Sequence, residues 1–187
     1  TSSYALPQSG EVQSKIIKTA NWNQGDPYNR KCPVNENGVH YVTGCVPTAT
    51  AIIMKSHCWP PTGIGEFDYS IDGEIFHVDF RDRIYNWDKM PDDIDENNCP
   101  DDVADEVSQL MADVGYASWA KYGVPGGTGA SPDFAMGALV KAFGYTPTIL
   151  NISRANCDGE FFMNIIKREI DNGRTLLIDS SNTPNEN

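Results

Sequence analysis

The sequence has no long hydrophobic run, little positive charge and only three histidines. None of its 187 residues belong to a run of about 20 apolar residues, the length that crosses a membrane. There are 14 Lys and Arg against 26 Asp and Glu, for a formal net charge of −12. Nucleic acids and anionic membrane surfaces are bound through basic patches, so we expect neither nucleic acid nor membrane as a partner. The length suits one domain, residues 1–187, with a sizeable core.

The first residues carry no recognisable targeting or inhibitory segment. Residues 1–15 are polar, and we expect an extended lead-in there. Residues 1–15 have the pattern of neither a signal peptide nor a propeptide, so we expect a processed or trimmed chain.

The five cysteines lack the spacing of a metal site. No two of them form a C-x-x-C pair, and the acidic residues 88–106 lack the pattern of a calcium loop with its central glycine. We therefore expect no metal and no other cofactor. If Cys45 is the odd cysteine, the other four could form two disulfides in an oxidising compartment, and both the pairing and four free thiols stay open. These four are Cys32, Cys58, Cys99 and Cys157.

Residues 43–55 place a cysteine where a loop becomes a helix. Gly44 allows a tight turn, Pro47 fits a first helical turn, and the small and apolar residues that follow continue a helix to about His57. At a helix N-terminus, unpaired N–H groups and the positive end of the dipole favour thiolate over thiol. The segment predicts Cys45 as a nucleophile, with a buried cysteine packed under a loop as the alternative.

Hydrophobic periodicity predicts mixed α and β elements in the rest of the chain. Alternating apolar residues predict a hairpin closing at residues 72–73. Helical spacing after Pro100 predicts a helix that Gly115 ends. Two further helices are expected, one capped by Ser131 and one capped by Asp158.

Three other segments are predicted to be loop or strand. Residues 123–130 are rich in glycine and predict a flexible loop. Residues 145–152 and 175–178 are apolar enough for strands. The second of these has no partner strand after it, which predicts a sheet that is cut short.

Several short motifs occur in order along the chain. They are WNQGDPYN at 22–29, TGCV at 43–46, TATA at 48–51, IMK at 53–55, NW at 86–87, LMADVG at 110–115 and FGY at 143–145. Together they resemble the streptopain family of secreted bacterial cysteine peptidases, over nearly the whole chain from Ile16 onward. The resemblance implies an α+β, papain-like fold, mostly its helical half plus the start of an antiparallel β half. Pro47 stands where the family commonly has a small residue.

The resemblance also implies site residues. Cys45 would be the nucleophile and Gln24 the side-chain donor of the oxyanion hole; without the motif, Gln24 would be taken for a solvated loop residue. Residues 126–131 resemble the wall of the family's substrate cleft, which makes Gly127, Thr128 and Ser131 candidate substrate contacts. Ser131 is equally explained as a helix cap. The implied partners are protein or peptide substrates and an inhibitory propeptide, and the implied location is outside a bacterial cell, at its surface or in its periplasm.

The family's catalytic histidine has no counterpart in this sequence. In the family it lies in a Gly-His-Ala-Phe type of segment after the strand that residues 175–178 resemble. His57 is twelve residues along the helix from Cys45, about 18 Å at 1.5 Å per residue. His40 and His77 are predicted on a loop and a strand.

Three explanations fit the missing base. The histidine lies on a second chain or a C-terminal remainder, or on residues of the same molecule that have not been observed. The third possibility is a truncated, inactive relative that binds peptides or inhibits a partner. The composition of residues 180–187 is polar and typical of a turn that can be nicked, which favours the first explanation. The sequence thus predicts a cysteine endopeptidase whose general base lies outside this chain.

Overall fold

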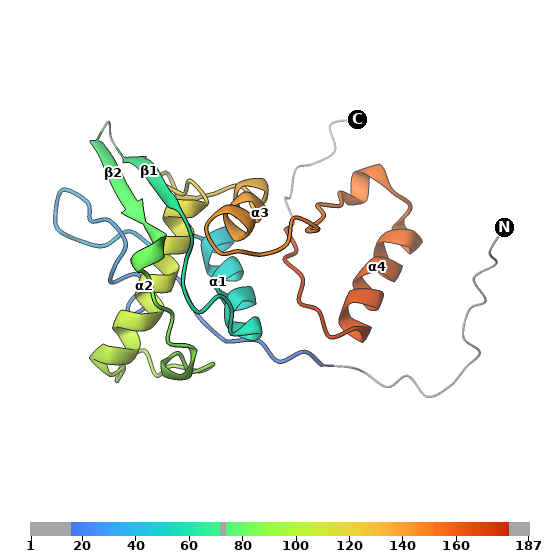
Figure 1. Cartoon of the computed structure of the whole chain (residues 1–187), viewed down its shortest axis with the longest axis horizontal. Coiled ribbons are helices and arrows are strands. Elements are labelled where there is room, and N and C mark those ends of the chain that lie inside the picture. The colour runs from blue at the N-terminus through green and yellow to red at the C-terminus, as the bar shows by residue number, and fades with distance from the viewer. Residues whose placement is uncertain (1–15, 72–73, 180–187) are drawn as a thin grey trace.

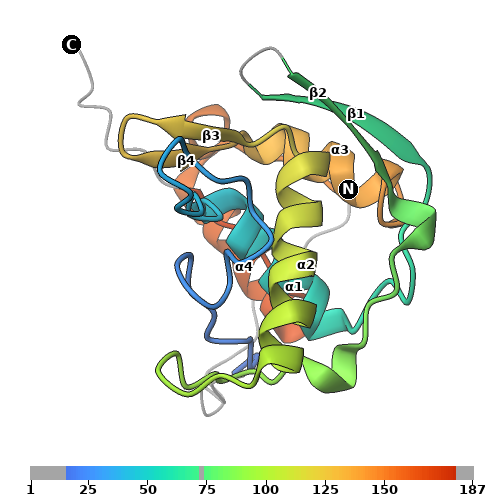
Figure 2. The same cartoon turned by 90° about the vertical axis from the view of Figure 1, so that its left-hand side faces the viewer.

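The computed structural model describes residues 16–71 and 74–179 (Figure 1). Helices α1, α2 and α3 lie together, and α1 lies between α2 and α4 (Figures 1 and 2). In chain order, the elements of the described part are α1 (Cys45–His57), β1 (Glu66–Ile71), β2 (Glu74–Asp79), α2 (Asp101–Ala117), β3 (Lys121–Val124), β4 (Gly127–Gly129), α3 (Pro132–Lys141) and α4 (Gly159–Asp171), with 3₁₀ turns at Phe80–Asp82, Trp87–Lys89 and Arg154–Asn156.

Helix α1 begins and ends where the sequence predicts. Its N-cap, Gly44, has a φ of 90°. This conformation is energetically unfavourable for any residue that has a side chain. The N–H of Thr48 donates to the Gly44 carbonyl at 3.1 Å, and the Thr48 hydroxyl donates to the same oxygen at 2.8 Å. Pro47 is buried in that turn. The helix closes at Cys58, which adopts the left-handed conformation.

Three helices bury one core. The side chains of α1, α2 and α3 pack together because each helix presents an apolar stripe to the other two. Each fully buried aliphatic side chain contributes about 1.5–3 kcal/mol relative to exposure. The members that are fully or nearly fully buried include Met54, Val107, Leu110, Met111, Val114, Ala138 and Phe143.

Strands β1 and β2 form the predicted antiparallel hairpin, in register from Glu66 opposite Asp79 to Ile71 opposite Glu74. The tip at residues 72–73 lies outside the described residues. Strands β3 and β4 form a second antiparallel pair, with Lys121 opposite Gly129. The prediction of a flexible loop at residues 123–130 is therefore wrong. The glycines of this segment turn the chain tightly, and Gly126 and Gly127 at its tip have positive φ.

Helix α2 does not end at Gly115, as predicted, but at Ala117. The reason for a glycine at this position is a close approach rather than a cap. A Cβ on Gly115 would lie 2.2 Å from the hydroxyl oxygen of Tyr122 on β3. The left-handed residue after the helix is Trp119, with a φ of 54°.

The two predicted strands at residues 145–152 and 175–178 are also wrong. A strand exists only where a neighbour pairs with its backbone, and in the described part neither segment has such a neighbour. Thr175 instead bonds through its hydroxyl to the ring of His57. The helices on either side are as expected, since Ser131 caps α3 and Asp158 caps α4 through their side chains. The lead-in at residues 1–15 lies outside the described residues.

The described part holds no helix that is both long and apolar enough to span a membrane. All five cysteines occupy described positions, and each is a free thiol. Of the alternatives open from the sequence, four unpaired cysteines beside Cys45 is therefore the one found. Among the described side chains, no three or more His, Cys, Asp or Glu converge as a metal site would require.

Candidate active site

Cys45 is an exposed thiol at the first residue of α1. Its neighbours Gly44, Val46 and Pro47 are buried, so the backbone there is fixed while the sulfur faces solvent. The first residues of a helix carry N–H groups with no partner inside the helix. The alternative of a cysteine buried under a loop is wrong for this position.

Gln24 lies next to the segment that leads into α1. The N–H of Thr43 donates to the carbonyl oxygen of Gln24 at 3.1 Å, which places Gln24 beside a residue only two positions before Cys45. The N–H of Gln24 itself donates to the Asn23 side chain at 2.8 Å. Gln24 is half-buried, so its backbone is held while part of its side chain stays accessible.

Two aromatic residues anchor the loop that carries Gln24. Trp22 is 7% exposed and donates its indole N–H to the carbonyl of Pro91 at 2.9 Å. Tyr28 is 1% exposed and belongs to the core. These rings are packing residues rather than parts of an open cleft wall.

Strand β4 packs against the other side of the same segment. The Thr128 hydroxyl donates to the Val42 carbonyl at 2.6 Å. A Cβ on Gly44 would lie 2.8 Å from the Thr128 carbonyl oxygen, and one on Gly127 would lie 3.2 Å from a Val42 methyl carbon. Glycine at position 44 therefore lets β4 approach the backbone immediately before the thiol.

Ser131 has a structural role in this arrangement. Its hydroxyl oxygen accepts from the N–H of Asp133 at 3.3 Å, which caps α3. The structure thus brings Gln24, Gly127 and Thr128 to the segment before Cys45, whereas the Ser131 side chain serves α3.

Each of the three histidines bonds elsewhere. His57, at the other end of α1, bonds the Tyr145 hydroxyl and the Thr175 hydroxyl, both at 3.2 Å, and burial lowers its pKa. The Nδ1 atom of His40 bonds the Cys32 carbonyl at 2.7 Å.

His77 is the third, and it lies on β2. Its Nδ1 bonds the Asp68 carboxylate at 2.9 Å, a bond that raises its pKa. Within the described residues, then, no histidine is hydrogen-bonded to the Cys45 thiol.

Alkylation should separate the five thiols by site. We expect iodoacetamide at mildly acidic pH to label Cys45 first, because the positive end of the α1 dipole stabilises an anion there. Cys32 should react last, because it is 3% exposed and burial raises its pKa to about 11. Peptide mass mapping over time measures each rate.

The matched control is Cys58, which is also exposed but follows the C-terminal end of the same helix. The negative end of the dipole disfavours a thiolate there, so Cys58 should react at least several times more slowly than Cys45. Equal rates for these two thiols would contradict an activated Cys45.

Known proteins are similar to this chain in sequence and in fold. The chain is 31% identical over 158 residues to the thiol protease/hemagglutinin PrtT of Porphyromonas gingivalis, a match covering 83% of this chain and 18% of that protein. It is 29% identical over 184 residues to a streptopain of Streptococcus pyogenes, covering 86% of this chain and 46% of the streptopain. Active wild-type interpain A, a cysteine protease of Prevotella intermedia, superposes with a TM-score of 0.75 at 33% identity, covering 83% of this chain and 64% of that chain.

A fragment of the precursor prointerpain A gives a TM-score of 0.72 at 33% identity, covering 80% of this chain and 49% of that one. The chain thus spans less than half the length of the curated relatives it matches. The predicted fold class, α+β and papain-like, is confirmed by these neighbours. The sequence profile of the Peptidase C10 family matches residues 22–186, and the chain belongs to that family of cysteine peptidases.

Proposed function

We propose that this chain is the nucleophile-bearing part of a cysteine endopeptidase. The observation that carries the proposal is the exposed thiol of Cys45 at the start of α1, with Gln24 on one side of the preceding segment and β4 on the other. A thiolate, a neutral donor and a backbone that can line a cleft are the parts that acyl transfer requires.

In the proposed reaction, the Cys45 thiol gives its proton to a histidine, and the resulting thiolate attacks the carbonyl carbon of the scissile peptide bond. The resulting oxyanion accepts hydrogen bonds from the N–H of Cys45 and the side-chain amide of Gln24. One such donor contributes on the order of 3 kcal/mol to transition-state stabilisation. The intermediate then collapses to a thioester, the amine leaves with a proton from a histidine, and water hydrolyses the thioester with the same histidine as base.

Gly127 and Thr128 are the proposed substrate-binding residues. The edge of a β-strand offers backbone donors and acceptors to an extended peptide. Strand β4 lies against Gly44, so a peptide bound along it would pass beside Cys45. Ser131 would help only through its backbone, because its hydroxyl caps α3.

The histidine is proposed to lie on a C-terminal remainder or a second chain. Apolar surface near the end of the described chain supports this. Helix α4 has no buried residue. A groove of about 310 Å³ between α1, α4 and the chain after α4 is lined mainly by apolar side chains. Leu176 and Ile178 are 36% and 64% exposed. Exposing such apolar side chains to water is unfavourable, and further protein packed against them would bury them.

We also propose the setting in which the enzyme acts. Residues 1–187 would be part of a single peptidase domain that is released from a bacterial cell, or held at its surface or in its periplasm. Its partners would be protein or peptide substrates and an inhibitory propeptide. The five cysteines are free thiols, so no disulfide argues for an oxidising compartment outside the cell. The proposed location therefore rests on the family alone.

A catalytically silent peptide-binding or regulatory relative is the second candidate. It is favoured by the histidines, each of which is engaged away from Cys45. Such a protein would use the same strand edge but form no acyl-enzyme.

Reconstitution separates these two candidates. The chain alone should hydrolyse peptides negligibly, and adding the C-terminal portion that supplies the histidine should restore turnover. A fluorogenic peptide and an intact mass for the acyl-enzyme provide the readouts. Hydrolysis by the chain alone would contradict a base outside the chain and would make His40 and His77 candidates again. No hydrolysis after reconstitution would favour the silent relative.

A further inference from the structure

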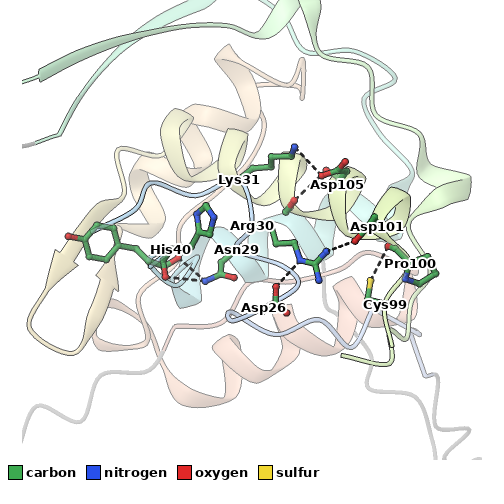
Figure 3. Close-up of polar contacts among 11 residues, drawn as sticks. Asp26, Asn29, Arg30, Lys31, His40, Cys99, Pro100, Asp101 and Asp105 are labelled. Carbon is green, nitrogen blue, oxygen red and sulfur yellow. Dashed lines mark hydrogen bonds and ion pairs between the residues drawn. The ribbon is translucent and has the colours of Figure 1, made fainter. Parts of the chain in front are cut away.

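The side chain of Asn29 joins the Gln24 loop to the segment before Cys45. Asn29 is 8% exposed, and its amide nitrogen donates to the carbonyls of His40 at 3.3 Å and Tyr41 at 3.1 Å (Figure 3). Asn29 is the last residue of the WNQGDPYN motif, and no local sequence pattern assigns it a role.

Gln24 and Asn29 together make two connections to the same segment. Asn29 bonds residues 40 and 41, and the carbonyl of Gln24 accepts from Thr43. We call these three hydrogen bonds the clamp. The clamp fixes the Gln24 loop at both ends against the few residues that run directly into Cys45.

The backbone that carries the Asn29 side chain is itself held in place. Its own N–H donates to the Gly25 carbonyl at 3.1 Å, and its carbonyl accepts from Cys32 at 2.9 Å. A buried amide with its backbone fixed on both sides has little freedom to find other partners. Asn29 therefore sets the spacing between the loop and residues 40–41 rather than adapting to it.

The next residues of the chain also contact residues 40 and 41, through the Cys32 carbonyl to the His40 ring and the Pro33 carbonyl to the Tyr41 N–H. The ion pairs of the loop lead in a different direction. Arg30 bonds Asp26 at 2.7 Å and Asp101 at 3.0 Å, and Lys31 pairs with Asp105 at 3.0 Å (Figure 3). These pairs join the loop to α2 or to itself, and they are at the surface, where ion pairs contribute little. None of them reaches residues 40–43.

We propose that Asn29 is a positioning residue, which holds Gln24 in the place where its amide can donate to the oxyanion formed at Cys45. The proposal rests on the proposed function for its catalytic consequence. Displacing an oxyanion donor by a fraction of an ångström weakens it in the transition state, whereas substrate binding along β4 does not involve the clamp.

A double-mutant cycle tests the proposal in the reconstituted enzyme. We expect Asn29→Ala to lower kcat about tenfold with KM unchanged. In a Gln24→Ala background the same substitution should change kcat by less than twofold, because the donor that it positions is gone. Asn29→Asp, which has the same shape but cannot donate, should lose as much as Asn29→Ala. Lys31→Ala, on the same loop, should be neutral.

Equal losses from Asn29→Ala in both backgrounds would overturn the proposal, since Asn29 would then act independently of Gln24. Wild-type kcat in both Asn29 variants would overturn it as well. A rise in KM without loss of kcat would assign Asn29 to substrate binding and also exclude positioning.

Amide hydrogen exchange tests the clamp without any activity. In the 187-residue chain, Asn29→Ala and Asn29→Asp should each speed exchange of the Thr43 amide at least tenfold. The amide of Leu110 in α2 should keep its rate, which reports an intact fold, and Lys31→Ala should change neither. Unchanged Thr43 exchange would overturn the clamp, whereas an inactive reconstituted wild type would refute only the proposed function.

Discussion

Cys45→Ala in the reconstituted enzyme should abolish peptide hydrolysis, lowering kcat by on the order of a hundred-thousandfold. The substitution removes the atom that forms the thioester. Cys45 directly follows the segment that bonds Gln24 and Thr128. Alanine is a good helix former, so α1 should keep its start at this exposed position. Steady-state turnover of a fluorogenic peptide and the absence of an acyl-enzyme mass are the measurements.

Cys58→Ala is the control for this experiment. Cys58 is equally a free, exposed cysteine beside α1, but it follows the opposite end of the helix. It should leave turnover unchanged. If Cys45→Ala kept more than about one hundredth of the activity, a thiol elsewhere or another mechanism would be responsible.

Gln24→Ala should lower kcat by roughly a hundredfold while KM stays nearly the same. An oxyanion donor acts mainly in the transition state, so its loss hardly changes binding of the substrate. The backbone carbonyl that Thr43 bonds remains in the alanine variant. Only the proposed donor is removed.

Two further measurements make the Gln24 result specific. Gln24→Glu has nearly the same shape but brings a negative charge and no amide donor, so it should lose at least as much as Gln24→Ala. An unchanged melting temperature excludes misfolding of the Trp22-anchored loop. If Gln24→Ala kept turnover within a few-fold of wild type, Gln24 would not be the oxyanion donor. If the protein is a silent peptide binder, the same substitution would change its affinity for peptide only modestly.

Local signals made part of the fold predictable. Helix α1 follows from Gly44, Pro47 and the small residues after it, and the caps Ser131 and Asp158 mark α3 and α4. Such signals act within a few residues, so a sequence displays them directly. The β1–β2 hairpin follows from alternation around a turn for the same reason.

Contacts between distant segments caused the wrong predictions. Gly115 reads as a helix end, but it is a glycine because Tyr122 packs against it. The chain at 175–178 has the composition of a strand, but in the described part it has no pairing neighbour. Composition reports what a segment prefers; pairing depends on what lies beside it.

The candidate site divides in the same way. Its residues were predicted one by one, from the helix start at Cys45 and from resemblance for Gln24, Gly127 and Thr128. Their proximity depends on hydrogen bonds from Thr43 to Gln24 and from Thr128 to Val42, which no local pattern encodes. The catalytic and substrate-binding roles of these residues stay predictions.

The close approach of Thr128 to Gly44 limits how the two segments can vary. A side chain at position 44 would meet both the carbonyl and the side chain of Thr128, and the φ of 90° adds a backbone cost. Position 44 should therefore be intolerant even in libraries that select only for folding. In a library that diversifies residues 126–129 to change which peptides are cut, the variants that fold should be those that keep the backbone of β4 in place. New specificity would then come from changed side chains and not from a shifted strand.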